Sequence, residues 1–304
     1  MMSISLAASS GISVRAARLP GWVGLIGPYL LLLFLALLLP LINLAVISFF
    51  KHSPSLMWVA EPTGENYVRL LDSYYIQVLV RTLRIGLITT IACLLLGAPL
   101  AYWLARCSRR TLAIGLFLIV MPMMVSTVIR AFGWMILLGR NGIINQVSVE
   151  IGIGRWLFVM NTETAVIIAL VQICLPLMVL PAMAAIEKIP ISLEEAATNL
   201  GAGPLALFAK VVLPLALPGL ASGALLSFVV AISVVVTPAL MGGRANRMIG
   251  NEIYDQVLTA LNWPFASAMA IVLILIVVML LAGSIWLAER LGSWLTGQPR
   301  AERG

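Results

Sequence analysis

Residues that could carry out chemistry are few in this sequence, and they form no recognisable catalytic or metal-binding pattern. The single histidine, His52, lies at the end of a long apolar run, so there is no His-Glu-x-x-His zinc site and no Ser-His-Asp triad. No Gly-Lys-Ser or Gly-Lys-Thr occurs, which excludes a P-loop for ATP, and Gly152–Gly154 lacks the third glycine of a dinucleotide-binding loop. Cys93, Cys107 and Cys174 form no Cys-x-x-Cys pair and are best explained as small core residues. We therefore expect no enzyme activity, no cofactor and no metal in this chain.

The stretch 187–218 carries the most informative pattern, because it predicts a short helix between two sharp turns. Pro190 should end the preceding helix. Ser192 is a good N-cap residue, and Glu195 follows it at the spacing of a capping box. Gly201 should end the short helix in the left-handed conformation. A second helix should then begin at Pro204 and lead the chain back into the membrane.

The predicted short helix needs a partner surface. Two turns of helix are too short to be stable alone. Glu194 and Glu195 would lie at the positive end of its dipole. A helix lying on lipid headgroups would favour Lys or Arg flanks and large aromatic residues on its apolar face, whereas this helix has two glutamates and small residues, so docking to a protein is the favoured interpretation. The apolar stripe follows helical spacing and consists of Leu193, Ala196, Ala197 and Leu200.

Long uncharged runs make up most of the chain and predict membrane-spanning helices. Hydrophobic residues account for 62% of the 304 residues and charged residues for only 10%, whereas soluble domains carry about 25% charged residues. The mean hydropathy is +1.07. A helix needs about 20 apolar residues to cross a bilayer, and the runs lack the alternation of a β-barrel. The expected spans are approximately 22–50, 84–105, 111–138, 164–186, 211–241 and 265–288.

These spans predict a transmembrane domain over 22–290, between a cytoplasmic segment 1–21 and a cytoplasmic tail 291–304. The first run is too long for the apolar region of a signal peptide and should be an uncleaved helix. With both termini inside, ten of the 19 Lys and Arg residues are cytoplasmic and nine are outside, so this bias hardly distinguishes the two orientations. The net charge of +7 is explained by loop residues that flank the spans, and no nucleic-acid partner is expected.

The stretch 187–218 resembles the EAA motif of ABC importer permeases, which reads EAA-x3-G-x9-I-x-L-P. The match departs from that pattern only in Val211, which stands in place of Ile. In that family the loop, here 187–210, forms a cytoplasmic coupling helix that docks into a cleft of an ATPase. The ATPase-coupling residues implied by this resemblance are Glu194, Glu195, Ala196, Ala197, Leu200, Gly201, Val211, Leu213 and Pro214.

The resemblance covers nearly the whole chain. It implies an all-α integral membrane protein with six transmembrane helices, the MetI-like architecture of a type I ABC importer permease. Further stretches are similar to polyamine-type permeases, which implies spermidine or putrescine as the substrate; ferric iron, sulfate and phosphonate remain alternatives. These stretches are Thr89–Tyr102, Pro122–Trp134, Leu138–Asn145, Leu175–Pro176, Thr237–Gly243 and Asn262–Pro264.

The same resemblance implies several partners. They are a pair of ATPase subunits that bind the ATP, a second permease subunit and a solute-binding protein outside the membrane. The second permease is expected to pack along small residues such as Ser222, Gly223 and Ala224. The protein would be a multi-pass protein of a bacterial inner membrane, in contact with lipid, with both termini in the cytoplasm.

The sequence offers few candidates for contact with a substrate. No Asp or Glu lies within the expected spans, which suggests that an external binding protein holds the selectivity and makes a secondary transporter or a channel less favoured. Arg130 lies about 29 Å along its helix, near the outer boundary, where it either extends toward the headgroups or takes part in the substrate path or in packing. The other candidates for the path or for packing are Trp134, Thr237 and Pro238.

Overall fold

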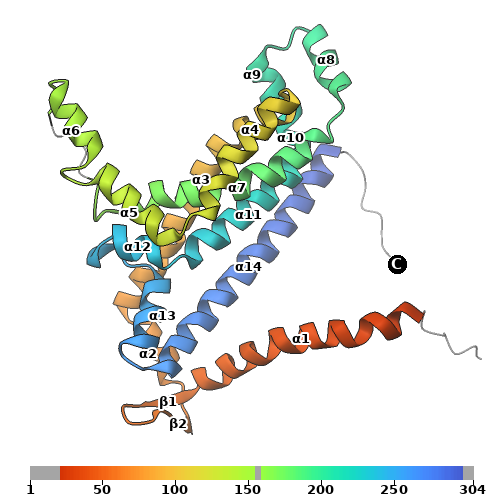
Figure 1. The fold of residues 1–304 in the computed structure, drawn as a ribbon. Coiled ribbons are helices and arrows are strands. Elements are labelled where there is room, and N and C mark those ends of the chain that lie inside the picture. Colours follow the sequence, from red (N-terminus) through yellow and green to blue (C-terminus); the bar gives the residue numbers. More distant parts are fainter. Residues whose placement is uncertain (1–20, 155–158, 297–304) are drawn as a thin grey trace, which may run out of the picture. The chain divides into compact units, whose positions relative to one another are not determined.

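The computed structural model describes residues 21–154 and 159–296, and Figure 1 shows the chain as a ribbon. The chain divides into two units, Met1–Val46 and Ile47–Gly304. The described part of the first unit is helix α1 (Gly21–Ser48), which covers most of the predicted span 22–50 and ends two residues inside the second unit. Apart from Gly21, the predicted segment 1–21 lies outside the described residues, and so do residues 297–304 of the predicted tail.

Three long helices form the centre of the second unit (Figure 1). They are packed along one another and bury two apolar clusters that follow one another along the helices. One cluster includes Ile85 and Leu170, and the other includes Leu104 and Ile186. A fourth long helix packs against α2 and α13 (Glu65–Leu70 and Ile249–Leu258). The three central helices are α3 (Ser73–Arg106), α7 (Glu163–Glu187) and α11 (Leu217–Ser233), and the fourth is α14 (Trp263–Thr296).

The predicted span 111–138 is not one helix. Helix α4 (Arg109–Val120) is followed by a 3-10 turn η1 (Met121–Met124), and α5 (Thr127–Leu138) leaves in a different direction. The bend across this break is 102°. Val125 and Ser126 take extended backbone angles, with ψ of 137° at both residues, which interrupts the helical hydrogen bonds. The expectation of a continuous helix is therefore wrong at this point.

The predicted span 211–241 is also broken. Pro214 and Pro218 lie close together and each removes a backbone donor, so the chain bends by 77° near Ala216 before α11 begins. A second break at Val234 separates α11 from a short helix. The elements on either side of these breaks are α9 (Pro204–Leu207), the π-helical turn η2 (Phe208–Val212), α10 (Leu213–Leu215) and α12 (Val236–Met241).

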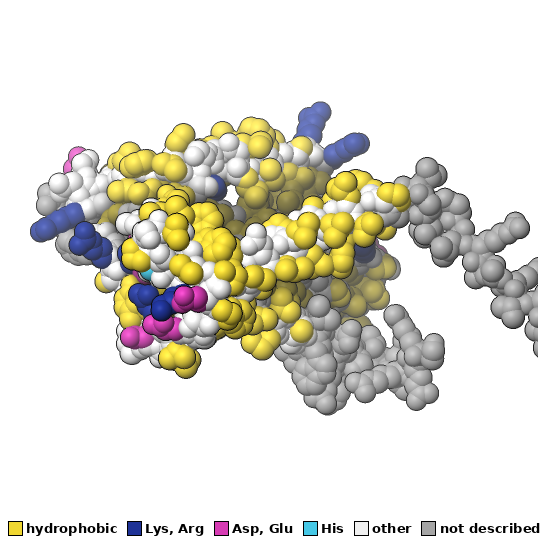
Figure 2. Space-filling view, turned by 90° about the horizontal axis from the view of Figure 1, so that it is seen from below, with side chains coloured by type: hydrophobic (Ala, Val, Ile, Leu, Met, Phe, Trp, Pro, Cys, Tyr) yellow, Lys and Arg dark blue, Asp and Glu magenta, His cyan; other side chains and the backbone are white. Residues whose placement is uncertain are grey.

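Helices α3, α7 and α14 follow the predicted spans more closely, although α3 begins at Ser73, well before the expected residue 84. Among the described residues, four helices are long and apolar enough to cross a membrane, and up to six spans result if each bent pair counts as one. Hydrophobic side chains cover most of the face shown in Figure 2, and charged side chains gather in a few groups there. Such a surface suits a lipid environment.

A small β-hairpin interrupts the otherwise helical fold and was not predicted. Strands β1 (Phe50–Ser53) and β2 (Met57–Pro62) pair in antiparallel fashion directly after α1. Asn66 at the start of α2 fastens the hairpin, because its buried side-chain amide donates to the carbonyl oxygens of Ser48 at 2.8 Å and Phe50 at 2.9 Å. The remaining elements are α6 (Ile143–Glu150) after α5 and the turn η3 (Arg244–Asn246) before α13.

Helices α7 and α11 approach each other closely at two glycines spaced four residues apart. A Cβ atom on Gly219 would lie 2.4 Å from Ala185 Cβ, and one on Gly223 would lie 2.8 Å from the carbonyl oxygen of Met178. Small residues at this spacing allow two helix backbones to pack closely. Gly223 therefore faces α7 of the same chain, and its predicted role in packing against a second permease is wrong.

Candidate functional site

The loop predicted from 187–210 contains the expected short helix, α8 (Ile191–Asn199), but not the expected N-cap. The helix begins directly after Pro190, whose ψ of 131° is not helical, so Ser192 is already the second helical residue. No side chain caps this end of α8; instead the Leu193 N–H donates to the Pro190 carbonyl oxygen at 3.1 Å. The prediction of a capping box between Ser192 and Glu195 is therefore wrong.

The C-terminal end of α8 has the predicted geometry. Gly201 takes a φ of +86°, in the left-handed region that favours glycine. The Gly201 N–H donates to the Thr198 carbonyl oxygen at 2.9 Å, and the Ala202 N–H donates to the Ala197 carbonyl oxygen at 3.0 Å. These two bonds form a Schellman motif and satisfy carbonyls that the helix end leaves free. Helix α9 then begins at Pro204, as the sequence predicts.

One face of α8 is open to its surroundings. Leu193, Glu195 and Ala196 are exposed, Ala197 is half-buried, and Leu200 is 89% exposed. An apolar stripe that its own chain leaves largely exposed on a two-turn helix matches a surface that docks to another protein. Figure 1 shows α8 projecting beyond the ends of α7 and α11.

Glu194 does not belong to that open face. Its carboxylate is buried and accepts hydrogen bonds from the side chains of Arg106 and Tyr102 on α3. Of the two adjacent glutamates that were predicted to take part in ATPase coupling, only Glu195 lies on the open face, and Glu194 faces α3. The helix phase decides this, because neighbouring residues on a helix point about 100° apart.

The last part of the predicted motif lies beyond the open face. Val211, Leu213 and Pro214 are half-buried in η2 and α10, and Leu213 packs against a cluster that includes Val212 and Ala216. These residues bend the chain from the loop into α11. Their effect on coupling would act through the direction of the chain.

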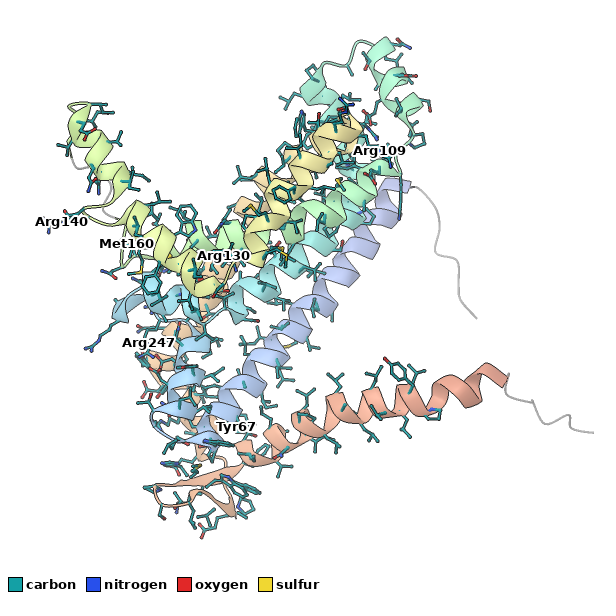
Figure 3. The ribbon with its side chains drawn as sticks, in the orientation of Figure 1. Tyr67, Arg109, Arg130, Arg140, Met160 and Arg247 are labelled. Carbon is teal, nitrogen blue, oxygen red and sulfur yellow. The ribbon has the colours of Figure 1, made fainter. Side chains whose placement is uncertain are left out.

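Away from the α8 loop, ion pairs join Arg247 to α13 of the second unit. Arg247 contacts Glu252 at 2.9 Å and also pairs with Asp255, while Tyr74 of α3 donates to Glu252 at 2.8 Å. Burial by itself would lower the pKa of the Arg247 guanidinium, but the hydrogen bond to Asp255 and the charges of both carboxylates outweigh it and raise that pKa above its usual value. Figure 3 labels Arg247 and Arg109, which lie far apart in the second unit.

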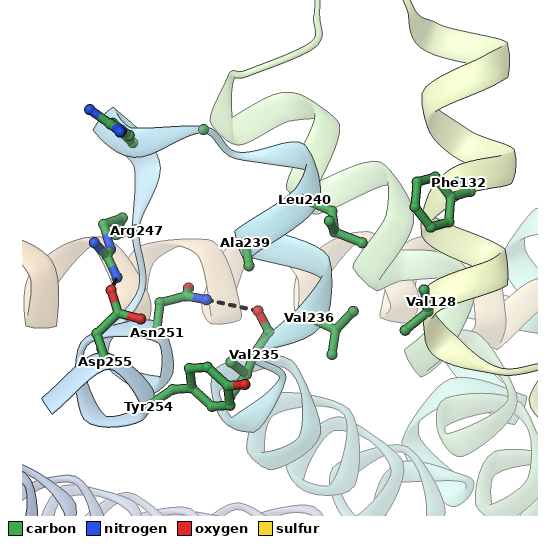
Figure 4. A pocket seen from close by; sticks show the side chains of 12 residues that line it. Val128, Phe132, Val235, Val236, Ala239, Leu240, Arg247, Asn251, Tyr254 and Asp255 are labelled. Atoms are coloured by element: carbon green, nitrogen blue, oxygen red, sulfur yellow. Dashed lines mark hydrogen bonds and ion pairs between the residues drawn. The ribbon is translucent and has the colours of Figure 1, made fainter. Parts of the chain in front are cut away.

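A pocket of about 520 Å³ lies between α5, α12 and α13 (Figure 4). Val128 and Phe132 of α5 lie on one side, and Arg247 and Asp255 point toward each other on the other side. Asn251 donates from its side-chain amide to the Val235 carbonyl oxygen at 2.8 Å and so fixes one wall. The remaining lining residues are Val235, Val236, Ala239, Leu240, Gly243, Arg244 and Tyr254. The lining thus combines apolar walls with both signs of charge, as small-molecule sites commonly do.

None of the predicted candidates for the substrate path lines this pocket. Thr237 and Pro238 are buried in α12, on the side away from the pocket. The Trp134 indole N–H donates to the Gln172 side-chain oxygen at 2.9 Å and joins α5 to α7. Arg130 is half-buried and donates to the Thr127 hydroxyl at 3.2 Å. Within this chain Trp134 packs against a buried apolar cluster, and Thr237 and Pro238 are buried.

The residues that do line the pocket were missed because no local pattern marks them. Phe132 lies between the candidates Arg130 and Trp134, and Ala239 and Leu240 directly follow Pro238. The sequence alone does not show which face of α5 or α12 lines the pocket, because that depends on the helices packed against them. In the described part of the chain, no group of three His, Cys, Asp or Glu side chains could hold a metal ion.

Comparison with known sequences identifies relatives over most of the chain. Residues 83–293 match the family described as binding-protein-dependent transport system inner membrane component. The spermidine/putrescine transport system permease protein PotB of Escherichia coli K12 is 40% identical over 230 residues, which cover 75% of this chain and 83% of that protein. The PotB protein of Haemophilus influenzae is 38% identical over 251 residues, which cover 82% and 87% of the two chains.

Comparison with solved structures supports the same fold. A chain of a bacterial alginate ABC transporter, in complex with an alginate pentasaccharide-bound periplasmic protein, superposes with a TM-score of 0.73 at 17% identity and covers 89% of this chain. A chain of the methionine transporter MetNI in an inward-facing conformation gives a TM-score of 0.53 and covers 71%. The fold comparison and the sequence relatives agree. The chain therefore belongs to the family of binding-protein-dependent transport system inner membrane components and is a multi-pass permease subunit of an ABC importer.

Proposed function

We propose that this permease receives the force of ATP hydrolysis through α8 from a separate pair of ATPase subunits, and that it forms half of a solute path with a second permease. The observation that carries the proposal is the open apolar face of α8, where Leu193, Ala196 and Leu200 are exposed while the Schellman motif and the Glu194 hydrogen bonds hold the loop in a defined shape. A solute-binding protein on the other side would deliver the substrate. ATP is bound by the ATPase subunits, and no cofactor is assigned to this chain.

Docking at α8 predicts a specific loss of ATPase association. Leu200→Asp places a charge on the most exposed apolar side chain of α8, so it should weaken co-purification of the ATPase by about tenfold or more without affecting membrane insertion. Leu56→Asp is the matched control, because Leu56 is also a strongly exposed leucine but lies at the tip of the hairpin. Equal ATPase recovery with wild type and Leu200→Asp would contradict docking through this face.

The proposed orientation places α8 in the cytoplasm, both termini inside, and the hairpin and α13 outside. In a background without the three native cysteines, Asn141→Cys should react with an impermeant maleimide added to intact cells, and Asn199→Cys should react only after the membrane is permeabilised. Both positions are exposed, whereas the nearby Asn145 is buried and unsuitable for labelling. Reaction of Asn199→Cys in intact cells would contradict the proposed orientation and place α8 outside.

We propose a polyamine as the substrate. The relatives at 38–40% identity are spermidine/putrescine permeases by name. The pocket offers a partly exposed carboxylate, Asp255, and the aromatic rings of Tyr254 and Phe132, groups that bind organic cations. Arg247 already pairs with Asp255, so the pocket should hold a cation weakly and leave most of the selectivity to the binding protein.

The substrate proposal is tested with the reconstituted complex of permease pair, ATPase and binding protein in proteoliposomes. ATP-dependent uptake of radiolabelled spermidine is expected, with competition by putrescine and none by sulfate, phosphonate or ferric citrate. Arg244 and Arg247 in the pocket wall favour an oxyanion as the second candidate. Uptake of sulfate in place of spermidine would select that candidate and leave the ATPase coupling intact.

A further inference from the structure

The short helix α8 contacts η2 and α9 and is joined to α3 through one buried side chain. Glu194 is its only buried residue, and the apolar residues of α8 are exposed or half-buried. Arg106, the last residue of α3, donates to Glu194 Oε1 from Nε at 2.9 Å and from Nη2 at 2.6 Å. The Tyr102 hydroxyl, one turn earlier on α3, donates to Glu194 Oε2 at 2.9 Å. Both carboxylate oxygens are therefore held by α3.

The same guanidinium group also holds the end of α7. Arg106 Nη2 donates to the carbonyl oxygens of Ile186 at 3.2 Å and Ile189 at 3.0 Å. These carbonyls lie in the last turn of α7 and in the turn that leads to α8, where helix ends leave acceptors without intrahelical partners. A cation at a helix C-terminus is also favoured by the helix dipole. Arg106 thus joins α3, α7 and α8 at a single point.

The geometry of this junction requires arginine. The side chains of Arg106 and Glu194 are only 20% and 10% exposed, so water competes less for this ion pair than for a pair on the surface. A planar guanidinium presents several donors in fixed directions, whereas a lysine ammonium is a single point that cannot reach the carboxylate and both carbonyls together. Removal of either partner would leave a buried charge without compensation.

We propose that Arg106 is a positioning residue for energy coupling, which makes α8 move as one body with the cytoplasmic ends of α3 and α7. This inference rests on the proposed docking of an ATPase at the open face of α8. Among the described side chains of α8 only Glu194 is buried, so this carboxylate carries a force on the open face to α3 and α7, beside the contacts that α8 makes with η2 and α9. Without the junction, α8 still docks but turns relative to α3, and ATP hydrolysis no longer drives the helices.

The test uses the full reconstituted complex and measures transport and ATP hydrolysis separately. For Arg106→Gln and Glu194→Gln, ATPase co-purification should be retained, and the amount of solute transported per ATP hydrolysed should fall about tenfold. Arg106→Lys should give an intermediate ratio. Arg109→Gln is the matched control: it removes the same charge three residues away, at an exposed arginine for which no ion pair is found among the described residues, and should leave the ratio at the wild-type value.

A distance measurement reports on the junction independently of activity. Spin labels at Asn199→Cys and Arg110→Cys, in a background without native cysteines, should give a narrow distance distribution in the wild-type complex and a broad one with Arg106→Gln. A wild-type transport ratio in Arg106→Gln, a proportional fall of transport and hydrolysis, or an unchanged distance distribution would each overturn the proposal. Failure of the wild-type chain to bind any ATPase would instead overturn the proposed function.

Discussion

Gly201→Val should reach the membrane at the wild-type level and lose at least about nine-tenths of its transport activity. The φ of +86° at Gly201 costs a residue with a Cβ atom about 1–2 kcal/mol, and a β-branched side chain is the least tolerant of it. No atom lies within 4 Å of a Cβ built on Gly201, so the effect comes from the backbone and not from a clash. The Schellman bonds would break, and the open face of α8 would lose its direction. Transport at matched membrane abundance is the measurement.

Gly203→Val is the control for this prediction. Gly203 also has no atom within 4 Å of a built Cβ, but its φ of −70° and ψ of 166° are ordinary for any residue before a proline. The control should therefore transport at close to the wild-type rate. Gly201→Asn should recover part of the activity, because asparagine tolerates the left-handed conformation better than valine. Wild-type transport by Gly201→Val would show that the shape of this loop does not matter for coupling.

Gly223→Val should abolish accumulation of the folded permease. A Cβ at this position lies 2.8 Å from the Met178 carbonyl oxygen and 3.1 Å from Met178 Cα, which are backbone atoms of α7 and cannot rotate away. Overpacking of this kind costs about 1–3 kcal/mol, and more where backbone must shift. Helices α7 and α11 belong to the central group, so their separation would open both apolar clusters. The measurement is the amount and the melting temperature of detergent-purified protein.

Gly283→Val provides the comparison within the membrane. Gly283 lies in α14 with no atom within 4 Å of a built Cβ, so the added methyl groups meet no neighbour in the described part of the chain. It should be produced in normal amounts and melt within a few degrees of the wild type. An equally stable Gly223→Val protein would mean that α7 and α11 are farther apart than they are here.

The residues of the α8 loop separate what local sequence predicts from what it does not. Gly201 could be predicted because the left-handed end of a helix depends on one residue type, and Pro204 because proline suits a first turn. The Ser192 cap was wrong although its pattern was correct, since the helix begins at Ile191, directly after Pro190 and two residues earlier than that cap requires. Pro190 and Ser192 both mark possible helix starts, and the local sequence does not show which of the two the chain uses.

The membrane spans show the same division. The uncharged run that ends near Glu187 predicts α7 well, because the cost of unpaired backbone in lipid makes a helix the only local solution. The bends of 102° near Val125 and 77° near Ala216 do not change the hydropathy, so counting uncharged residues cannot detect them. The segments after each bend, α5 and α11, take directions that their packing against α12 and α7 sets.

The sequence by itself determined that this protein is a helical membrane protein with a short, glycine-ended helix in one loop, because span length, backbone satisfaction in lipid and left-handed glycine are all local constraints. Its resemblance to the EAA motif added the permease family. Only the tertiary structure decided which of two adjacent glutamates is buried and which is open, because that choice depends on where Arg106 of α3 lies beside α8. It also brought Phe132, Asn251 and Asp255 to one pocket. Contacts between segments more than 80 residues apart leave no periodic or local trace in the chain.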